Sequence, residues 1–156
     1  MRQPACVAST LDDILFVVLG EQAPTDFVNG AEIEFIPYDD DPVRVAQFYQ
    51  AASVYVHPAR VDTFPDAVLE AMACGRPVVA SSVGGIPEQV VHEKTELLVP
   101  AGDAEAMALC VIRLLKDRDL RTRMGGRGAM RVAQRFDLEA EVASYMAWYE
   151  AVVSRN

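Results

Sequence analysis

Asp62 and Glu70 stand eight residues apart in a stretch where most neighbouring side chains are small or apolar. Glu70 interrupts the run Ala-Val-Leu-Glu-Ala-Met-Ala-Cys, which predicts a helix over residues 67–74. An ionised carboxylate only accepts hydrogen bonds, and the hydroxyls of a sugar are matching donors. The spacing therefore favours a sugar nucleotide as ligand, with Glu70 at the ribose, Asp62 at the second sugar and the amides of the helix start at the diphosphate.

The same acids also fit a purely structural role. Asp66 and Glu70 are four residues apart, so they would share one solvated face of the helix. The segment Thr63-Phe64-Pro65-Asp66 matches a capping box in which Asp replaces the usual Glu. From spacing alone, both interpretations remain open.

The elements that would position these residues alternate along the chain. Apolar runs predict strands at residues 14–19, 33–36, 54–56, 78–80 and 96–99. Amphipathic stretches predict helices at residues 43–52, 67–74 and 119–135, one helix capped by Asp103 and a last one capped by Asp137. Gly75 is placed to end the helix at residues 67–74.

This alternation predicts an α/β fold with a doubly wound parallel sheet. Ligands of such sheets bind beyond the carboxyl ends of the strands. The segments that follow the predicted strands, and would form that edge, are residues 20–22, 37–41, 57–66 and 81–88.

Composition narrows the class of protein. The 156 residues suit a single domain over residues 1–156, and a formal net charge of −9 argues against a general nucleic-acid binder. The three cysteines show no metal-ligand spacing and fit a reducing compartment. The longest apolar run, residues 14–19, is too short to span a bilayer, and residues 1–13 lack the pattern of a signal peptide. We therefore expect a cytoplasmic protein that binds no nucleic acid.

The segment "VYVHPARVDTFPDAVLEAMACGRPVVASSVGGIPEQVV" resembles the donor-site region of group-1 (family 4-like) retaining glycosyltransferases of the GT-B fold. The family pattern is an acid, seven residues, Glu within "LEAMACG", then "PVVAS" and "GGxPE". Further segments that resemble the family are "FVVLGE", "IEFIPYDDDPVRVAQFYQAA", "LLVPAGDAEAMALCVIRLLKD" and "RMGGRGAMRVAQRF". The resemblance covers nearly the whole chain. It implies a Rossmann-like domain, one half of a GT-B fold, in an enzyme that transfers a sugar from a nucleotide diphosphate with retention of configuration.

The resemblance also assigns roles to residues of this chain. Asp62 stands where the family has the acid that faces the donor sugar, and Glu70 where a second acid binds the ribose hydroxyls. These two are the candidate catalytic residues. The other candidate donor-binding residues are Pro37 and Tyr38 at the base, Thr63, Phe64, Asp66, Ala67 and Val68 at the sugar hydroxyls and diphosphate, and Gly84 and Gly85 in the bordering loop. The implied partner is a UDP-, GDP- or ADP-sugar, and no cofactor or metal is implied.

Several positions depart from the family. Pro65 stands where the family often has Gly and removes one amide donor, and Asp66 adds a negative charge beside the expected phosphates. Glu93 and Glu96 stand where the family usually has Gly. Nothing before Ile14 supplies the family's first strand and helix, with their Arg and Lys, and the acceptor-binding domain is also expected to be missing from this chain. We therefore expect the chain alone to be inactive, and the alternative function is a non-catalytic nucleotide-sugar-binding or scaffold module that acts with a partner chain.

Two surface features have open interpretations. Arg123, Arg127, Arg131 and Arg135 recur every four residues, which fits contact with lipid phosphates at the inner face of a membrane or a solvated helix face. His57 follows a predicted strand. It fits either a hydrogen-bond donor to a phosphate of the ligand or a histidine with a structural role at the strand end. The apolar last helix would favour self-association where the acceptor-binding domain is missing.

Overall fold

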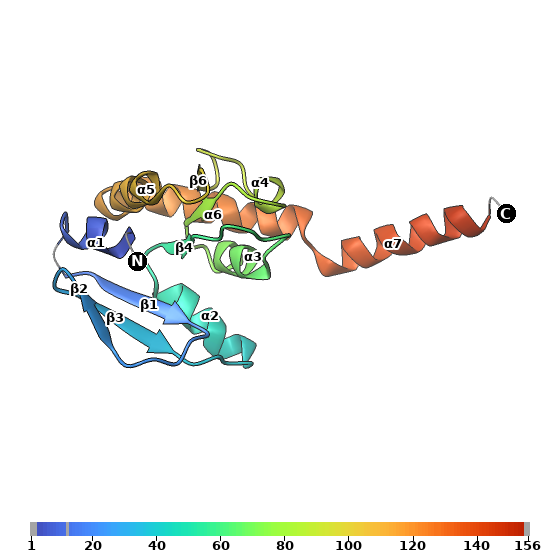
Figure 1. The fold of residues 1–156 in the computed structure, drawn as a ribbon. Helices are drawn as coiled ribbons and strands as arrows, with labels where there is room; N and C mark the ends of the chain where they lie inside the picture. Colours follow the sequence, from blue (N-terminus) through green and yellow to red (C-terminus); the bar gives the residue numbers. More distant parts are fainter. Residues whose placement is uncertain (1–2, 12, 155–156) are drawn as a thin grey trace.

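The computed structural model describes residues 3–11 and 13–154, and Figure 1 shows their arrangement. Helices alternate with short strands along most of the chain, which confirms the predicted α/β class. The elements are α1 (Gln3–Ala8), β1 (Leu15–Leu19), β2 (Asp26–Val28), β3 (Ala31–Ile36), α2 (Pro42–Ala51), β4 (Tyr55–His57), α3 (Asp66–Ala73), β5 (Val78–Ser81), α4 (Ile86–Gln89), β6 (Leu97–Val99), α5 (Ala104–Lys116), α6 (Arg118–Arg135) and α7 (Leu138–Val153).

The strands form two three-stranded sheets among the described residues, where the sequence predicted one. The first has the order β1-β3-β2, with β1 parallel and β2 antiparallel to β3. The second, β4-β5-β6, is parallel throughout. Strand β2 was not predicted, although the Asn-Gly pair at residues 29–30 is a hairpin signal. In the structure Asn29 and Gly30 have φ of 50° and 85°, as a two-residue hairpin turn requires.

The second sheet is covered on both faces, as a doubly wound arrangement requires. Val79 packs in a cluster with residues of α5, whereas Val78 and Ala80 pack in a cluster with residues of α3. All three side chains have no exposed surface. Burial on both faces explains why β5 is a continuous apolar run without alternation.

Helix α3 forms where the sequence predicted it, because its residues are good helix formers with one apolar face. That face buries Val68, Ala71 and Met72. Gly75 ends the helix with φ of 70°, a left-handed conformation in which glycine is favoured. The capping-box interpretation is wrong: the N-cap is Pro65, and no side chain caps the helix.

Two of the glycines of α6 allow other parts of the chain to approach the helix closely. A Cβ atom on Gly125 would lie 2.9 Å from the carbonyl carbon of Gly75, at the end of α3. One on Gly128 would overlap the carboxylate of Glu96. Gly126 faces open space, with nothing within 4 Å of such an atom.

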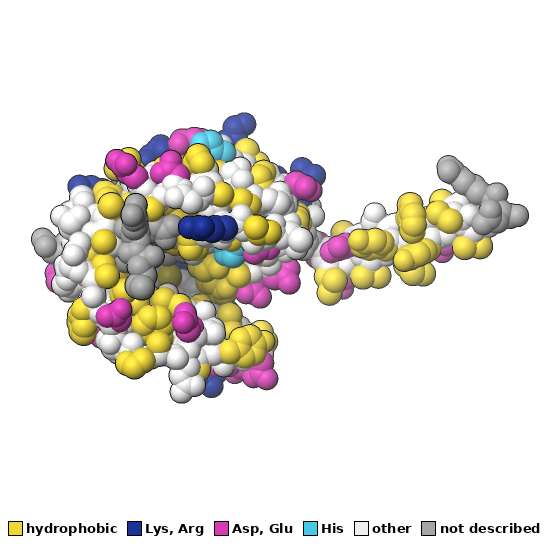
Figure 2. Space-filling view, viewed as in Figure 1, with side chains coloured by type: hydrophobic (Ala, Val, Ile, Leu, Met, Phe, Trp, Pro, Cys, Tyr) yellow, Lys and Arg dark blue, Asp and Glu magenta, His cyan; other side chains and the backbone are white. Residues whose placement is uncertain are grey.

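Helix α7 extends away from the rest of the molecule (Figure 1), and every one of its described residues is exposed. Apolar side chains cover much of it (Figure 2), and Trp148 and Tyr149 stack edge to face with ring centroids 5.1 Å apart. Within residues 3–11 and 13–154, none of the helices combines the length and apolar character that crossing a bilayer requires.

Because α7 buries nothing, we expect a variant lacking residues 138–156 to keep its fold. Its free energy of unfolding should differ from that of the full chain by less than about 0.5 kcal/mol, as for changes at exposed surface. Urea unfolding followed by circular dichroism measures this. Sedimentation of both proteins over a range of concentrations tests the predicted self-association, which should be lost with α7. A loss of several kcal/mol would show that α7 packs on the domain.

Candidate functional site

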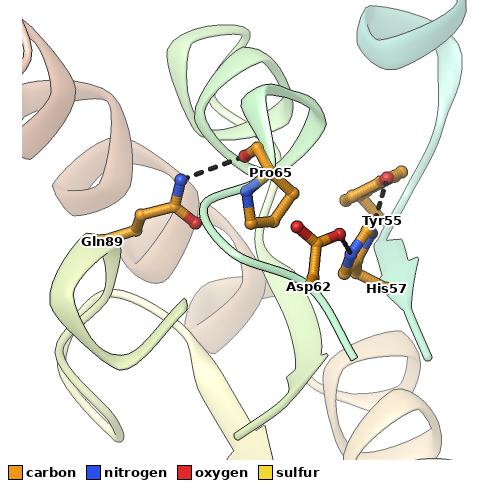
Figure 3. Close-up of polar contacts among 5 residues, drawn as sticks. All are labelled: Tyr55, His57, Asp62, Pro65 and Gln89. Carbon is orange, nitrogen blue, oxygen red and sulfur yellow. Dashed lines mark hydrogen bonds and ion pairs between the residues drawn. The ribbon is translucent and has the colours of Figure 1, made fainter. Parts of the chain in front are cut away.

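The loop between β4 and α3, residues 58–65, carries the first candidate acid and is held at three points. Asp62 Oδ2 lies 3.2 Å from His57 Nε2, at the end of β4. The carbonyl of Thr63 accepts from the N–H of Gly85 at 2.6 Å. The carbonyl of Pro65 accepts from Gln89 Nε2 at 3.0 Å (Figure 3). These three contacts, two of which come from Gly85 and Gln89 farther along the chain, therefore fix this β4–α3 loop.

Gly84 and Gly85 pack directly against this loop, so the structure brings the two predicted segments together. Gly84 has φ of 50°, and a Cβ atom there would overlap the carbonyl of Asp62. A Cβ on Gly85 would lie 2.5 Å from Thr63 O and 2.6 Å from Phe64 Cδ2. Only residues without a side chain fit here, which gives a physical reason for the Gly-Gly pair.

Glu70 lies one turn inside α3 on its exposed side. Its Oε2 accepts a hydrogen bond from the hydroxyl of Tyr49, on α2, at 3.1 Å. Burial raises the pKa of Tyr49 far above its usual value, and Tyr55 and Glu70 add to this, so the hydroxyl keeps its proton. The carboxylate is thus oriented by a buried donor and still reaches the surface.

The first turn of α3 contributes backbone and one charge. The first N–H groups of a helix have no acceptor within it and carry the positive end of the helix dipole. Asp66 is exposed there, whereas the side chain of Val68 is fully buried and its N–H donates to Pro65 O at 3.3 Å. Ala67 is half-buried. Val68 can therefore serve a ligand only indirectly, by packing the helix.

Pro37 and Tyr38 lie in the other part of the molecule, directly after β3. Tyr38 is 81% exposed. Among the residues that the structure describes, no hydrogen bond, ion pair or aromatic pair joins either residue to the β4–α3 loop. The structure thus groups Asp62 to Val68 with Gly84 and Gly85, and within residues 3–11 and 13–154 it shows no direct polar or aromatic contact from them to the two candidate base-binding residues.

Sequence reasoning missed Gln89 and Tyr49. Gln89 is fully buried on the short helix α4, and its amide holds the N-cap residue of α3. Tyr49 was expected only as part of a helix. A polar side chain in an apolar context was the available signal for Gln89. For Tyr49 the sequence offered none, because its contact with Glu70 spans two helices.

Of the four arginines that recur along α6, at residues 123, 127, 131 and 135, Arg131 is already engaged within the protein. Arg131 donates from Nε to Gln89 O at 2.6 Å and from an Nη to Glu88 O at 2.7 Å, and its guanidinium lies 5.8 Å from the Phe136 ring centroid. Burial lowers the pKa of Arg131. Arg131 therefore holds α4 against α6, while contact of the other arginines with lipid stays a prediction.

The comparisons with known proteins agree on one family. The model described as "Glycosyl transferases group 1" matches residues 7–131. D-inositol 3-phosphate glycosyltransferase of Jonesia denitrificans is 35% identical over 134 residues, which are 85% of this chain and 31% of that protein. N-acetyl-alpha-D-glucosaminyl L-malate synthase of Bacillus anthracis is 36% identical over 110 residues, which are 70% of this chain and 29% of that protein.

Solved structures agree with this. Sucrose-phosphate synthase from Thermosynechococcus elongatus has a TM-score of 0.84 and 29% identity, covering 99% of this chain and 42% of that one. Anabaena HepE in complex with UDP-glucose has a TM-score of 0.79 and 19% identity over 94% of this chain and 44% of that one, a likeness of fold. The predicted α/β half of a GT-B fold is thereby confirmed. This chain spans about a third of the length of the curated relatives described above.

Proposed function

This chain belongs to the group 1 glycosyl transferases, and on that basis we propose that it forms the part of a transferase that binds the donor, a nucleoside diphosphate sugar. The complete enzyme would transfer the sugar with retention of configuration to an acceptor held by a separate domain. We further propose that donor binding needs no cofactor or metal ion.

The observation that carries the proposal is the packing of the β4–α3 loop on Gly84 and Gly85 at the start of α3. In the proposed site, Asp62, the amides of the first turn of α3 and Glu70 would follow one another along the donor. The amides at the start of α3 are suited to bind a diphosphate, because they donate hydrogen bonds and the helix dipole favours an anion. An acid on either side of the diphosphate would then meet a different sugar.

The two acids would divide the donor between them. Glu70, held by Tyr49, would accept hydrogen bonds from the ribose hydroxyls, and Asp62 would accept from a hydroxyl of the transferred sugar. Support for the donor class comes from Anabaena HepE, which shares this fold and was solved with UDP and with UDP-glucose. The charge of Asp66 beside the diphosphate would weaken binding, so we expect modest affinity from the isolated chain.

Substitution of each acid by its amide tests this division of labour. Glu70→Gln should weaken binding of both UDP and UDP-glucose by roughly 2 kcal/mol, about thirtyfold, because the amide loses the charge and one acceptor. Asp62→Asn should spare UDP and weaken UDP-glucose, since UDP has no second sugar. Titrations followed by ligand-observed NMR, with and without EDTA, measure both affinities.

A matched control is Glu93→Gln. Glu93 follows α4 in the sequence, and its exposed carboxylate pairs with Arg113 at 2.8 Å. The substitution should leave both affinities unchanged. Equal losses of UDP binding in Glu70→Gln and Asp62→Asn would refute the division of labour.

A further inference from the structure

A continuous set of contacts leads from a packed tyrosine pair to both candidate acids. Tyr49 and Tyr55 stack edge to face, with ring centroids 5.4 Å apart. The hydroxyl of Tyr49 donates to Glu70. The hydroxyl of Tyr55 lies 3.2 Å from His57 Nδ1, and His57 Nε2 lies 3.2 Å from Asp62 Oδ2 (Figure 3). One aromatic pair thus orients Glu70 directly and Asp62 through the imidazole.

The contacts of His57 determine which ring nitrogen carries the proton. Burial raises the pKa of Tyr55 to about 12, and the carboxylates of Glu70 and Asp62 add to this, so the phenol remains a donor at neutral pH. A phenol that donates to Nδ1 requires Nδ1 to accept, which leaves the proton of the neutral ring on Nε2. Nε2–H then donates to Asp62.

We propose that His57 is a positioning residue that fixes the carboxylate of Asp62, so that one oxygen is held by Nε2–H and the other is directed at a hydroxyl of the donor sugar. This inference rests on the proposed function. In Figure 3 the second oxygen of Asp62 points away from the imidazole. The side chain of Asp62 is 28% exposed, so a ligand can reach it, and that of His57 is 16% exposed.

Positioning by His57 matters because the other contacts of the β4–α3 loop hold its backbone and not the side chain of Asp62. The hydrogen bonds of Thr63 and Pro65 hold the backbone, and only His57 contacts the Asp62 carboxylate among the polar contacts of the described residues. An acid that must discriminate between hydroxyls of a sugar needs a fixed direction as well as a fixed backbone. Tyr55 would act one step further back, by setting the tautomer.

The proton position can be measured without any ligand. The chain has two histidines, and in His92 the Nδ1 atom accepts from the N–H of Leu98 at 3.0 Å, so its Nε2–H tautomer is an internal reference. Long-range ¹H–¹⁵N NMR of the neutral rings should show the Nε2–H pattern for both. In Tyr55→Phe the pattern of His92 should persist, while the preference of His57 for Nε2–H should weaken, because only Asp62 then selects that tautomer.

Binding tests the consequence. His57→Leu should weaken UDP-glucose about tenfold, corresponding to roughly 1.4 kcal/mol, and change the affinity for UDP less than about twofold. His57→Gln, whose amide nitrogen can donate in place of Nε2–H, should recover most of the loss. Tyr55→Phe should have an intermediate effect. Thermal unfolding of each variant checks that the fold is kept. Retained binding of UDP is a second check that the donor site has not been lost as a whole.

The outcomes are distinguishable. A wild-type chain that binds neither UDP nor UDP-glucose refutes the proposed function and, with it, this role of His57. Binding of both ligands with equal losses in His57→Leu, or with no loss, refutes the positioning role alone. A wild-type His57 that carries its proton on Nδ1 refutes it as well.

Discussion

We expect Glu96→Gln to stabilise the protein by about 4 kcal/mol at pH 7.5, and we expect the gain to fall below about 1 kcal/mol at pH 5. Glu96 is fully buried, and the N–H of Val78 donates to its Oε2. Burial raises the pKa of Glu96 to about 9, although the Val78 hydrogen bond acts in the opposite direction. The folded protein therefore holds Glu96 protonated at neutral pH, and glutamine has the shape of that neutral form.

The sign follows from where the proton is bound. In the unfolded chain Glu96 ionises at its ordinary pKa of 4.5, whereas in the folded chain it ionises near pH 9. Between these values the folded state binds one more proton, so wild-type stability falls by about 1.4 kcal/mol per pH unit as pH rises. Below pH 4.5 the contribution is fully present, and above pH 9 no more is lost. Glutamine does not titrate, so its variant lacks this slope.

Urea unfolding at pH values from 5 to 9 measures the difference between the two proteins. The control is Glu93→Gln, because hydrogen bonds from Arg113 lower the pKa of Glu93, the opposite direction. That variant should show no gain in stability as pH rises. Parallel pH profiles of wild type and Glu96→Gln would show that Glu96 is ionised in the folded protein.

Gly125→Ala should destabilise the protein by about 3 kcal/mol, because α6 has no room for a side chain where it crosses the end of α3. A Cβ atom would lie closer than 3.0 Å to the carbonyl oxygen of Gly75 and 3.4 Å from Cδ of Pro77. Both neighbours are rigid: one is backbone and the other is a proline ring. The helix must therefore move away from α3, with loss of buried contacts.

Gly126→Ala is the matched control, since the same change one residue along meets nothing within 4 Å. Alanine has the higher helix propensity, so this variant should be more stable than wild type by about 0.5–1 kcal/mol. Thermal and urea unfolding give both values. Equal effects of the two substitutions would mean that helix propensity alone governs these glycines and that α6 does not touch Gly75.

Local patterns in the sequence were sufficient for most helices and strands. Asp103 and Asp137 cap α5 and α7 as predicted, by accepting from the N–H groups of Ala106 and Ala140 at 2.9 Å. Gly75 ends α3 as predicted. These features depend on residues within one turn of each other, so the order of residue types is enough to specify them.

The family and the α/β class were also determined by the sequence, because the motif around Asp62 and Glu70 is long and unusual in composition. The assignment of the individual donor-binding residues stays a prediction. The same motif did not reveal that the capping box is absent, because the match to a capping box rested on residue types alone and the helix begins after Pro65 with no side-chain cap.

Only the tertiary structure decided which side chains orient the acids and which strands pair. Tyr49 meets Glu70 across 21 residues of sequence, and Gln89 meets Pro65 across 24. Glu96, predicted to lie in a turn or at a strand start, becomes a buried neutral acid because β5 and α6 close around it. Such contacts depend on how elements pack in three dimensions, and neither propensity nor periodicity within one element encodes the partner that lies across the interface.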